Sequence, residues 1–342
     1  MNDRIADLVQ QIRTGDHAQR HAAEEQLTAL GTPAVEYLLP LFEGAKPPHA
    51  ARAARCLTEV GEPALDALRD IRRHGPGRLR RPALHALTEV GGGDALSPED
   101  RLAVERLIRI KLIDEEKIRL PAGSWIAIPA DQVPGAVRAL GLHDLRPATL
   151  AMGISAAHSH HQDAVTYRVP DGAKKTAYRI FITPDIEGWR LIYGRQFLHD
   201  SNGVDIAIQL SAQCEQAHFF DIDDGNDSRV WWVAENGETR RGYSNHWHPE
   251  GVGDPLPFET GSSISWAWDE EEDPEDWEED EEESAEEAEE EEVVLETDPH
   301  EVAMKISAHP AELRNVTLHD HGWLATTQAD CPNSRFKGAL SL

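Results

Sequence analysis

The chain has 342 residues, of which 40% are hydrophobic, and its 62 acidic and 33 basic side chains give a formal net charge of −29. This length accommodates two or three domains, and we exclude an integral membrane protein because no apolar run approaches the roughly 18 residues that a membrane span needs. The first residues, MNDRIADLVQQIR, carry charges where a secretory signal needs an apolar stretch. Three widely spaced cysteines fit reduced thiols. We therefore expect a cytoplasmic protein.

Three copies of a 30-residue repeat occupy most of the first hundred residues. Each copy carries alanine and leucine at helical spacing followed by a glycine, as in AEEQLTALGTPAVEYL, ARCLTEVGEPALDAL and ALHALTEVGGG. The aligned glycines are Gly31, Gly61 and Gly91, and each is expected to provide a left-handed helix exit. Pro33 and Pro63 suit the first turn of a second helix in two of the copies. The pattern predicts alternating helices that stack into a solenoid.

This segment, over about residues 5–95, resembles the HEAT-like repeats of the phycobilin-lyase type. The resemblance implies a scaffold surface for protein binding and does not imply lyase activity, since no pigment-binding constellation is present. An amphipathic helix is predicted next at 97–117, with Ser97 as N-cap and Pro98 at its first position. We therefore predict a HEAT-like helical repeat domain over residues 1–117.

A basic run, RDIRRHGPGRLRR, covers the end of one repeat helix, a Gly-Pro-Gly turn and the start of the next helix. Its arginines are Arg69, Arg72, Arg73, Arg78, Arg80 and Arg81. Arginine near a helix C-terminus is favoured by the helix dipole, so solvated helix ends are one interpretation and a site for an anionic partner is the other. The run lacks aromatic residues that stack on bases, and the chain is strongly acidic, so we do not expect binding to nucleic acid.

From about residue 118 the chain takes on the β-branched and aromatic composition of strands. Strands are predicted at 125–128, 176–183, 189–193, 228–234 and 239–243, and helices at 204–216 and 299–307. The Asn236-Gly237 pair favours a tight hairpin turn between the last two strands. These elements predict an α+β domain over residues 118–342 with a mainly antiparallel sheet, and hence an α+β multidomain fold for the whole chain.

The segments GWRLIYG, RVWWVAENGETRRGY and HGWLAT are similar to those of uncharacterised bacterial proteins grouped with immunity proteins. The resemblance implies a protein that neutralises a toxin, and it transfers no catalytic residue because its shared positions are packing and turn residues. Trp231 and Trp232 alternate between the two faces of their strand. We therefore expect at most one of the two to be buried and the other to be available as a binding anchor.

An acidic tract, residues 269–292, holds 19 acidic residues and no lysine or arginine, which leaves 43 acidic against 33 basic residues elsewhere. Charge at this density prevents a packed core, so we expect a disordered insertion. A solvating loop is the simplest interpretation, and docking on the basic run of the same chain is another. The functional interpretation is a segment that binds a basic protein, through Asp276, Trp277, Glu278, Glu279 and Asp280.

Histidines form three pairs with HxH spacing, namely His158 and His160, His246 and His248, and His319 and His321. Alternate residues of a strand share a face, so such a pair can place two imidazoles on one Zn²⁺, with Asp163 or Asp320 completing the shell. The pairs lie in polar stretches that are typical of surface loops. The acidic segment 221–227 has the start of a calcium loop but lacks the glutamate at its twelfth position, so we interpret it as a turn between strands.

The sequence contains no GxSxG, GxxxxGK[ST], GxGxxG or HExxH motif. Cys56 and Cys214 fall on predicted helices and are expected in the core, whereas Cys331 is a candidate for exposure. We predict a non-enzymatic cytoplasmic protein without a cofactor, of immunity type or regulatory, that engages a basic protein through the acidic tract. The alternative is a zinc-binding protein or metal-dependent enzyme that uses the HxH pairs.

Overall fold

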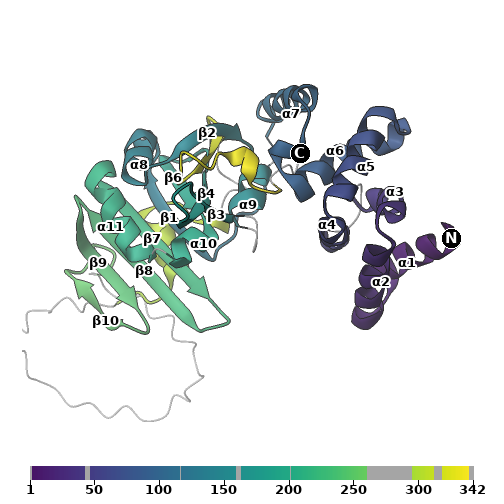
Figure 1. Cartoon of the computed structure of the whole chain (residues 1–342). Coiled ribbons are helices and arrows are strands. Elements are labelled where there is room, and N and C mark those ends of the chain that lie inside the picture. The colour runs from purple at the N-terminus through teal and green to yellow at the C-terminus, as the bar shows by residue number, and fades with distance from the viewer. Residues whose placement is uncertain are drawn as a thin grey trace, which may run out of the picture.

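Helices make up the first third of the chain, and a sheet flanked by helices makes up the rest (Figure 1). The computed structural model describes residues 2–42, 47–115, 117–158, 163–200, 202–259, 295–311 and 318–338. Every strand pair within these ranges is antiparallel. The predicted α+β class with a mainly antiparallel sheet is therefore confirmed.

The helical part is a series of short helices that share one hydrophobic core. It consists of α1 (Asn2–Thr14), α2 (His17–Leu30), η1 (Thr32–Ala34), α3 (Val35–Leu38), η2 (Leu39–Phe42), α4 (Pro47–Val60), α5 (Glu62–His74), α6 (Gly77–Gly91), η3 (Gly93–Ala95) and α7 (Pro98–Lys111). The alanine and leucine positions shared by the three repeats are all buried in this core, as an apolar helix stripe requires. The Ser97 hydroxyl accepts a hydrogen bond from the Asp100 amide and caps α7, as predicted.

The glycines after the repeat helices differ between copies. Gly31 and Gly61 have positive φ angles of +66° and +74°, as predicted. In the third copy, however, Gly91 is still part of α6 and Gly92 takes the positive φ, +69°, so that prediction is wrong by one residue. The helix predicted over 97–117 also ends early, at Lys111, because the Leu112 amide closes the helix on the carbonyls of Ile108 and Ile110.

The repeat glycine Gly61 gives a direct test of this backbone requirement. Gly61→Ala is expected to destabilise the protein by about 1–2 kcal/mol, because an L-residue is strained at positive φ. Gly77→Ala is the matched control, since a methyl group there also meets no atom within 4 Å but φ is not positive, and it is expected to be neutral or mildly stabilising in the first turn of α6. Urea unfolding of the two variants checks the difference, and equal stabilities would contradict it.

The sheet is formed by the strands β1 to β12, which are numbered in chain order. Its strands are β1 (Ser124–Pro129), β2 (His143–Ala148), β3 (Ala164–Arg168), β4 (Lys174–Ile182), β5 (Asp185–Ile186), β6 (Trp189–Tyr193), β7 (Gln216–Asp223), β8 (Ser228–Glu235), β9 (Glu238–Ser244), β10 (His248–Gly253), β11 (Leu318–His319) and β12 (Gly322–Thr326). The main order is β10-β9-β8-β7-β1-β6-β4-β12-β2, with β3 beside β4 and the short pair β5–β11 beside β6. The predicted tight turn joins β8 to β9, and both Asn236 and Gly237 have positive φ.

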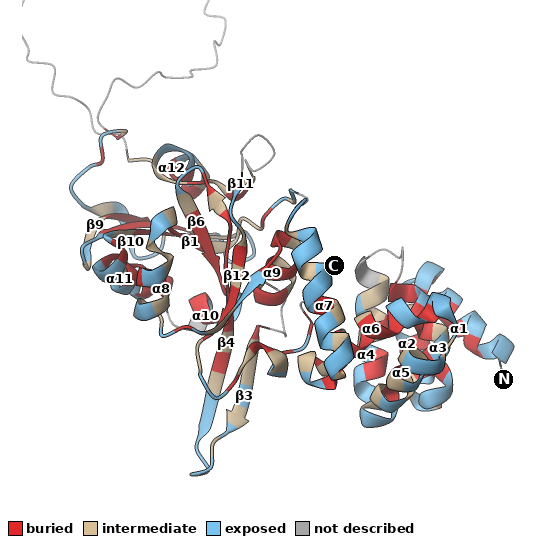
Figure 2. Ribbon diagram, turned by 90° about the horizontal axis from the view of Figure 1, so that it is seen from above, coloured by how far each residue is buried: buried red, intermediate tan, exposed pale blue. Residues whose placement is uncertain are grey.

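Helices cover both faces of the sheet (Figure 2). One face packs against α8 (Val133–Ala139), α10 (Arg195–Asp200) and α11 (Gly203–Cys214), and the other packs against α9 (Leu150–Ala157) and α12 (Pro299–Ile306). Trp231 and Trp232 point to opposite faces and are both buried, 0% and 6% exposed. The prediction that at most one of them is buried is therefore wrong, because it assumed a sheet with one covered face.

The three cysteines are unpaired and buried. Burial of Cys56 and Cys214 was predicted from their places on helices, and it raises the pKa of both thiols to about 11. Cys331 is not exposed, contrary to the sequence interpretation, because it packs with Ala177 and Phe336 in a small cluster beneath the C-terminal segment.

The C-terminal segment 331–338, which includes η6 (Asn333–Arg335), connects the sheet with the helical part. The Gly338 amide donates a hydrogen bond to the Thr88 carbonyl of α6, at 2.9 Å. Gly92 lies so close to the segment that a Cβ there would be 2.3 Å from the Phe336 carbonyl oxygen. Ile108 of α7 packs against both the helical core and one core of the sheet. These contacts place α6 and α7 beside β2, β4 and β12.

Candidate anion-binding site

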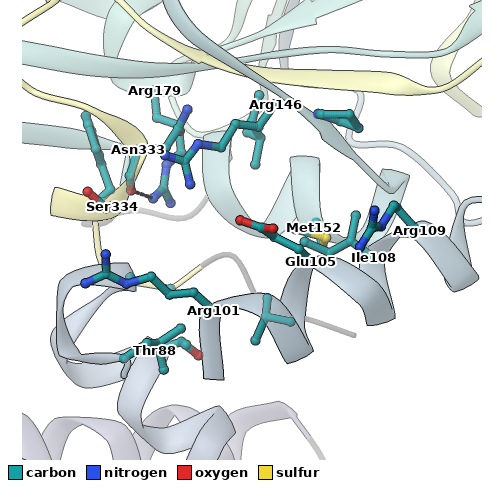
Figure 3. Close-up of a pocket in the computed structure, with 17 residues that line it drawn as sticks. Thr88, Arg101, Glu105, Ile108, Arg109, Arg146, Met152, Arg179, Asn333 and Ser334 are labelled. Carbon is teal, nitrogen blue, oxygen red and sulfur yellow. Dashed lines mark hydrogen bonds between the residues drawn. The ribbon is translucent and has the colours of Figure 1, made fainter. Parts of the chain in front are cut away.

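A cavity of about 550 Å³ lies where the helical part meets the sheet (Figure 3). Its helical wall comes from α6, η3 and α7, and its other walls come from β2, α9, β4, β12 and the C-terminal segment. Four arginines line it, together with the single carboxylate of Glu105. We call these arginines, with Asn333, the cavity cluster: Arg101, Arg109, Arg146, Arg179 and Asn333.

Arg179 is the most deeply buried charged group of the cavity cluster. It lies on the same face of β4 as Ala177 and Phe181, and its side chain is 2% exposed. The Nη1 and Nη2 groups donate to the backbone carbonyls of Lys337 (3.2 Å) and Asn333 (3.0 Å), and the guanidinium carbon lies 4.7 Å from the centre of the Phe336 ring. The Nε atom is buried and has no hydrogen-bond partner.

The charge of Arg179 is not neutralised by an ion pair with any residue that the structure describes. Burial lowers the pKa of its guanidinium to about 9, Arg146 contributes in the same direction, and the carboxylates of Asp163 and Glu89 act in the opposite direction without reaching ion-pair distance. The group is therefore still cationic at neutral pH. A buried cation with a free N–H donor favours an anion beside it.

Arg146 and Asn333 lie next to Arg179 and are held by Asp144. The Arg146 Nε donates to the Asp144 carboxylate at 3.0 Å, and no described residue accepts a hydrogen bond from its Nη groups. Asp144 also accepts from the Asn333 amide (2.7 Å) and, through its backbone carbonyl, from Asn333 Nδ2 (2.8 Å). Asn333 Oδ1 is left buried without a partner. Figure 3 shows Arg146, Arg179 and Asn333 converging at one end of the cavity.

The helix α7 provides the opposite wall. Arg101, Glu105 and Arg109 are spaced four residues apart, so they project from one side of the helix (Figure 3). None of the three forms an ion pair within 4 Å with another part of the described chain. With one carboxylate against four guanidinium groups, the cavity has a net positive charge.

The basic run that the sequence singled out is largely occupied by contacts within the helical part. The Arg72 Nε donates to the Asp100 carboxylate at 2.7 Å, the Arg80 Nε donates to the Gly75 carbonyl, and Arg69 forms ion pairs with Glu62 and Asp66. Three further arginines of the run are exposed at the end of α5 and on the first turns of α6: Arg73, Arg78 and Arg81. None of the arginines of the basic run lines the cavity that holds the cavity cluster.

The acidic tract and the residues predicted to bind a partner within it, Asp276, Trp277, Glu278, Glu279 and Asp280, lie outside the described residues. The segments on either side of it are fixed to neighbouring strands. Glu259 forms a buried ion pair with Arg241 of β9, and the Trp231 Nε1 of β8 donates to the Glu296 carbonyl at 2.8 Å.

The histidine pairs have different surroundings. The His158 ring lies edge-on to Tyr193, whereas the His248 and His321 rings pack at tilted angles against Trp232 and Trp323. His160 lies outside the described residues. Within the parts of the chain that the structure describes, no group of three or more potential metal ligands comes together. His246 precedes β10, and His319 is the last residue of β11. The metal-binding alternative stays a prediction.

The acidic segment 221–227 contains the predicted turn between β7 and β8, but the turn is confined to 224–227, because residues 221–223 are still paired with β8. The carboxylates of Asp221 and Asp223 already have partners. Asp221 accepts hydrogen bonds from Ser124 and Ser228, and Asp223 accepts from the Gly225 amide and from Asn226. These hydrogen bonds stabilise the turn, which accounts for the acidic residues in this segment.

The sequence interpretation missed the cavity cluster. Its members come from four distant segments, namely α7, β2, β4 and the C-terminal segment, so no local motif contains them. One local signal was present, namely an arginine in the otherwise apolar strand TAYRIFIT. In a sheet covered on both faces such an arginine must be buried, and a buried arginine needs hydrogen-bond acceptors or an anion.

Comparisons with protein-family models, with curated proteins and with solved structures found no match. Among the described residues, no helix combines the length and the apolar character needed to cross a membrane. Function is therefore inferred from the chemistry of the residues themselves.

Proposed function

We propose that this protein is a non-enzymatic binding protein that holds an anionic ligand between its helical part and its sheet. The proposal is carried by one observation, the buried guanidinium of Arg179 with an unpartnered Nε and no ion pair. Arginine is suited to phosphate and carboxylate groups because its donors form a planar fork. The free Nη groups of Arg146 supply further donors beside it.

The other lining residues support an organic anion. Leu96, Val104, Ile108, Met152 and Leu324 contribute apolar surface to the same cavity. Ligand sites commonly combine such a lining with a few polar groups that fix the orientation of the ligand. A bare inorganic ion would leave most of this apolar surface without contact.

The test is calorimetric titration of the full chain with hexylphosphonate, a single anionic group on an apolar chain. Arg146→Gln is expected to weaken binding about tenfold, because it removes charge-assisted hydrogen bonds worth roughly 1.5–3 kcal/mol. Arg146 is half-exposed, so the variant is expected to fold. Arg78→Gln, an exposed arginine of the basic run, is the matched control and is expected to change affinity less than twofold. No binding, or a loss with Arg78→Gln alone, would contradict the proposal.

We further propose that residues 1–117 form a HEAT-like helical repeat domain and that residues 118–342 form the α+β domain. The shared core of the helical part, with its repeated buried alanine and leucine positions, supports a HEAT-like solenoid. In this arrangement the solenoid supplies one wall of the ligand site through α7. The three unpaired cysteines favour a reducing compartment, and we place the protein in the cytoplasm.

A second candidate function is binding of a basic protein by the acidic tract, in an immunity-type or regulatory role. It is favoured by the 19 acidic residues of the tract and by the flanking residues Glu259 and Glu296, which contact the adjacent strands β9 and β8. The test compares the full chain with a chain lacking 269–292. Retention of a basic protein that needs the tract and weakens as salt rises supports this candidate, and equal retention by both chains contradicts it.

A further inference from the structure

We propose that the ligand is an organic polyanion that bridges the two parts of the chain, with one anionic group at Arg146 and Arg179 and a second at Arg101 and Arg109 of α7. This inference rests on the proposed function and specifies its ligand. It follows from the distribution of charge around the cavity, which places two arginines on each of two facing walls.

The first anionic group is held at the buried end. Arg146 offers both Nη groups to one phosphate-like or carboxylate-like group, and the buried Arg179 guanidinium beside it adds a positive charge that no ion pair with a described residue neutralises. The backbone carbonyls of Asn333 and Lys337 fix the Arg179 guanidinium in place, so little side-chain entropy is lost when the anion binds.

The second anionic group is held at α7. Arg101 and Arg109 lie on the same side of the helix with Glu105 between them, and neither is engaged in an ion pair with a described residue. The two arginines are eight residues apart, about 12 Å along the helix axis, with Glu105 between them, so the second anionic group contacts one guanidinium group and is attracted by the other. Both arginines are exposed, so they reach the ligand from the open side of the cavity.

The apolar part of the cavity lining determines the chemistry of the ligand between its anionic groups. Ile108, Met152, Leu324 and Phe336 contribute apolar surface to the lining of the same cavity. The volume of about 550 Å³ falls within the roughly 300–1,000 Å³ of sites for organic ligands. A molecule with two separated anionic groups and an organic middle uses all three regions at once.

Such a ligand would also fasten the helical part to the sheet. Near the cavity the two sides are joined by the hydrogen bond from the Gly338 amide to the Thr88 carbonyl, and Gly92 lies close to Phe336. A polyanion adds charge-assisted contacts to both walls, so its binding stabilises one relative placement of the two parts.

The test compares two probes, hexane-1,6-diphosphonate and its one-headed counterpart hexylphosphonate, on the full chain. The two-headed probe is expected to bind at least tenfold more tightly. The double variant Arg101→Gln/Arg109→Gln is expected to remove this advantage of the two-headed probe over hexylphosphonate. Arg106→Gln, on α7 but outside the cavity lining, is the control and is expected to leave both affinities unchanged.

The outcomes separate the two proposals. If hexylphosphonate binds and depends on Arg146, but the two-headed probe binds no more tightly or is insensitive to the α7 variant, the bridging polyanion is overturned and the anion site stands. If neither probe binds, the proposed function itself is overturned. Unchanged circular dichroism and melting temperature show that each variant has folded.

Discussion

Replacing Glu259 by alanine is expected to destabilise the protein by about 3–5 kcal/mol, because it leaves the Arg241 guanidinium buried without its counter-ion. Arg241 and Glu259 are 6% and 0% exposed and are joined by hydrogen bonds of 2.7 and 3.0 Å. Glu259 also accepts from the Leu256 amide, and Arg241 donates to the Gly253 carbonyl. The pair thereby fixes the loop that follows β10.

Urea unfolding measures this effect, and Asp254→Ala provides the matched control. Asp254 pairs with Arg240 in the same loop, but it is 93% exposed, so its removal is expected to cost less than about 1 kcal/mol. The double variant Arg241→Met/Glu259→Leu is expected to lose less than the sum of its single variants, because neither charge is left alone. A loss with Glu259→Ala as small as that of Asp254→Ala would contradict the role of the buried pair.

Acid is expected to destabilise the protein through His218 of β7. This imidazole is 3% exposed, packs against Trp189 and has an Nδ1 without a partner. Burial lowers its pKa to about 3 from an ordinary 6.5. The unfolded chain therefore binds a proton between pH 6.5 and 3 that the folded chain does not bind, so this contribution to stability is complete above pH 6.5 and is lost as the pH falls.

The expected loss between pH 7 and pH 5 from this one group is about 2 kcal/mol. His218→Phe keeps a ring against Trp189 and is expected to remove that part of the pH dependence. The control is His143→Gln, since His143 is exposed at the start of β2. Free energies of unfolding at pH 7 and pH 5 check the prediction, and an unchanged difference in the His218→Phe variant would refute it.

The sequence predicted those elements whose pattern is local and strong. The repeat helices, the strands at β1, β4, β6, β8 and β9, and the hairpin at Asn236-Gly237 all carry periodic apolar residues or specific turn residues. The strand β2, HDLRPA, was missed because it lies at an edge, is largely exposed and contains Pro147. The short helices α8 and α9 were missed because seven or eight residues give little periodicity.

The order of the strands and the cavity could not be predicted from such patterns. Strand β12 lies between β4 and β2 although it begins 140 residues after the end of β4 and 174 residues after the end of β2. This long-range pairing brings the C-terminal segment over Arg179 and so creates the anion site. The burial of both Trp231 and Trp232 has a different cause, since helices from distant parts of the chain cover both faces of the sheet.

The charge pattern along the chain was informative about composition but misleading about the site. The run from Arg69 to Arg81 is the densest group of bases in the sequence, yet Arg69 and Arg72 are ion-paired to nearby acids. Arg179 is isolated in sequence and unpaired in the structure. The free energy of a charged group depends on its burial and its partners rather than on the number of like charges beside it in the sequence.

A crystal structure of the full chain grown with hexane-1,6-diphosphonate locates the anion directly. Binding in the cavity predicts one phosphonate within hydrogen-bond distance of the Arg146 Nη groups, at the end of the cavity where Arg179 lies. An empty cavity, with the phosphonates instead on the exposed arginines at 73, 78 and 81, would show that the anion site lies on the basic run and that Arg179 is a structural residue.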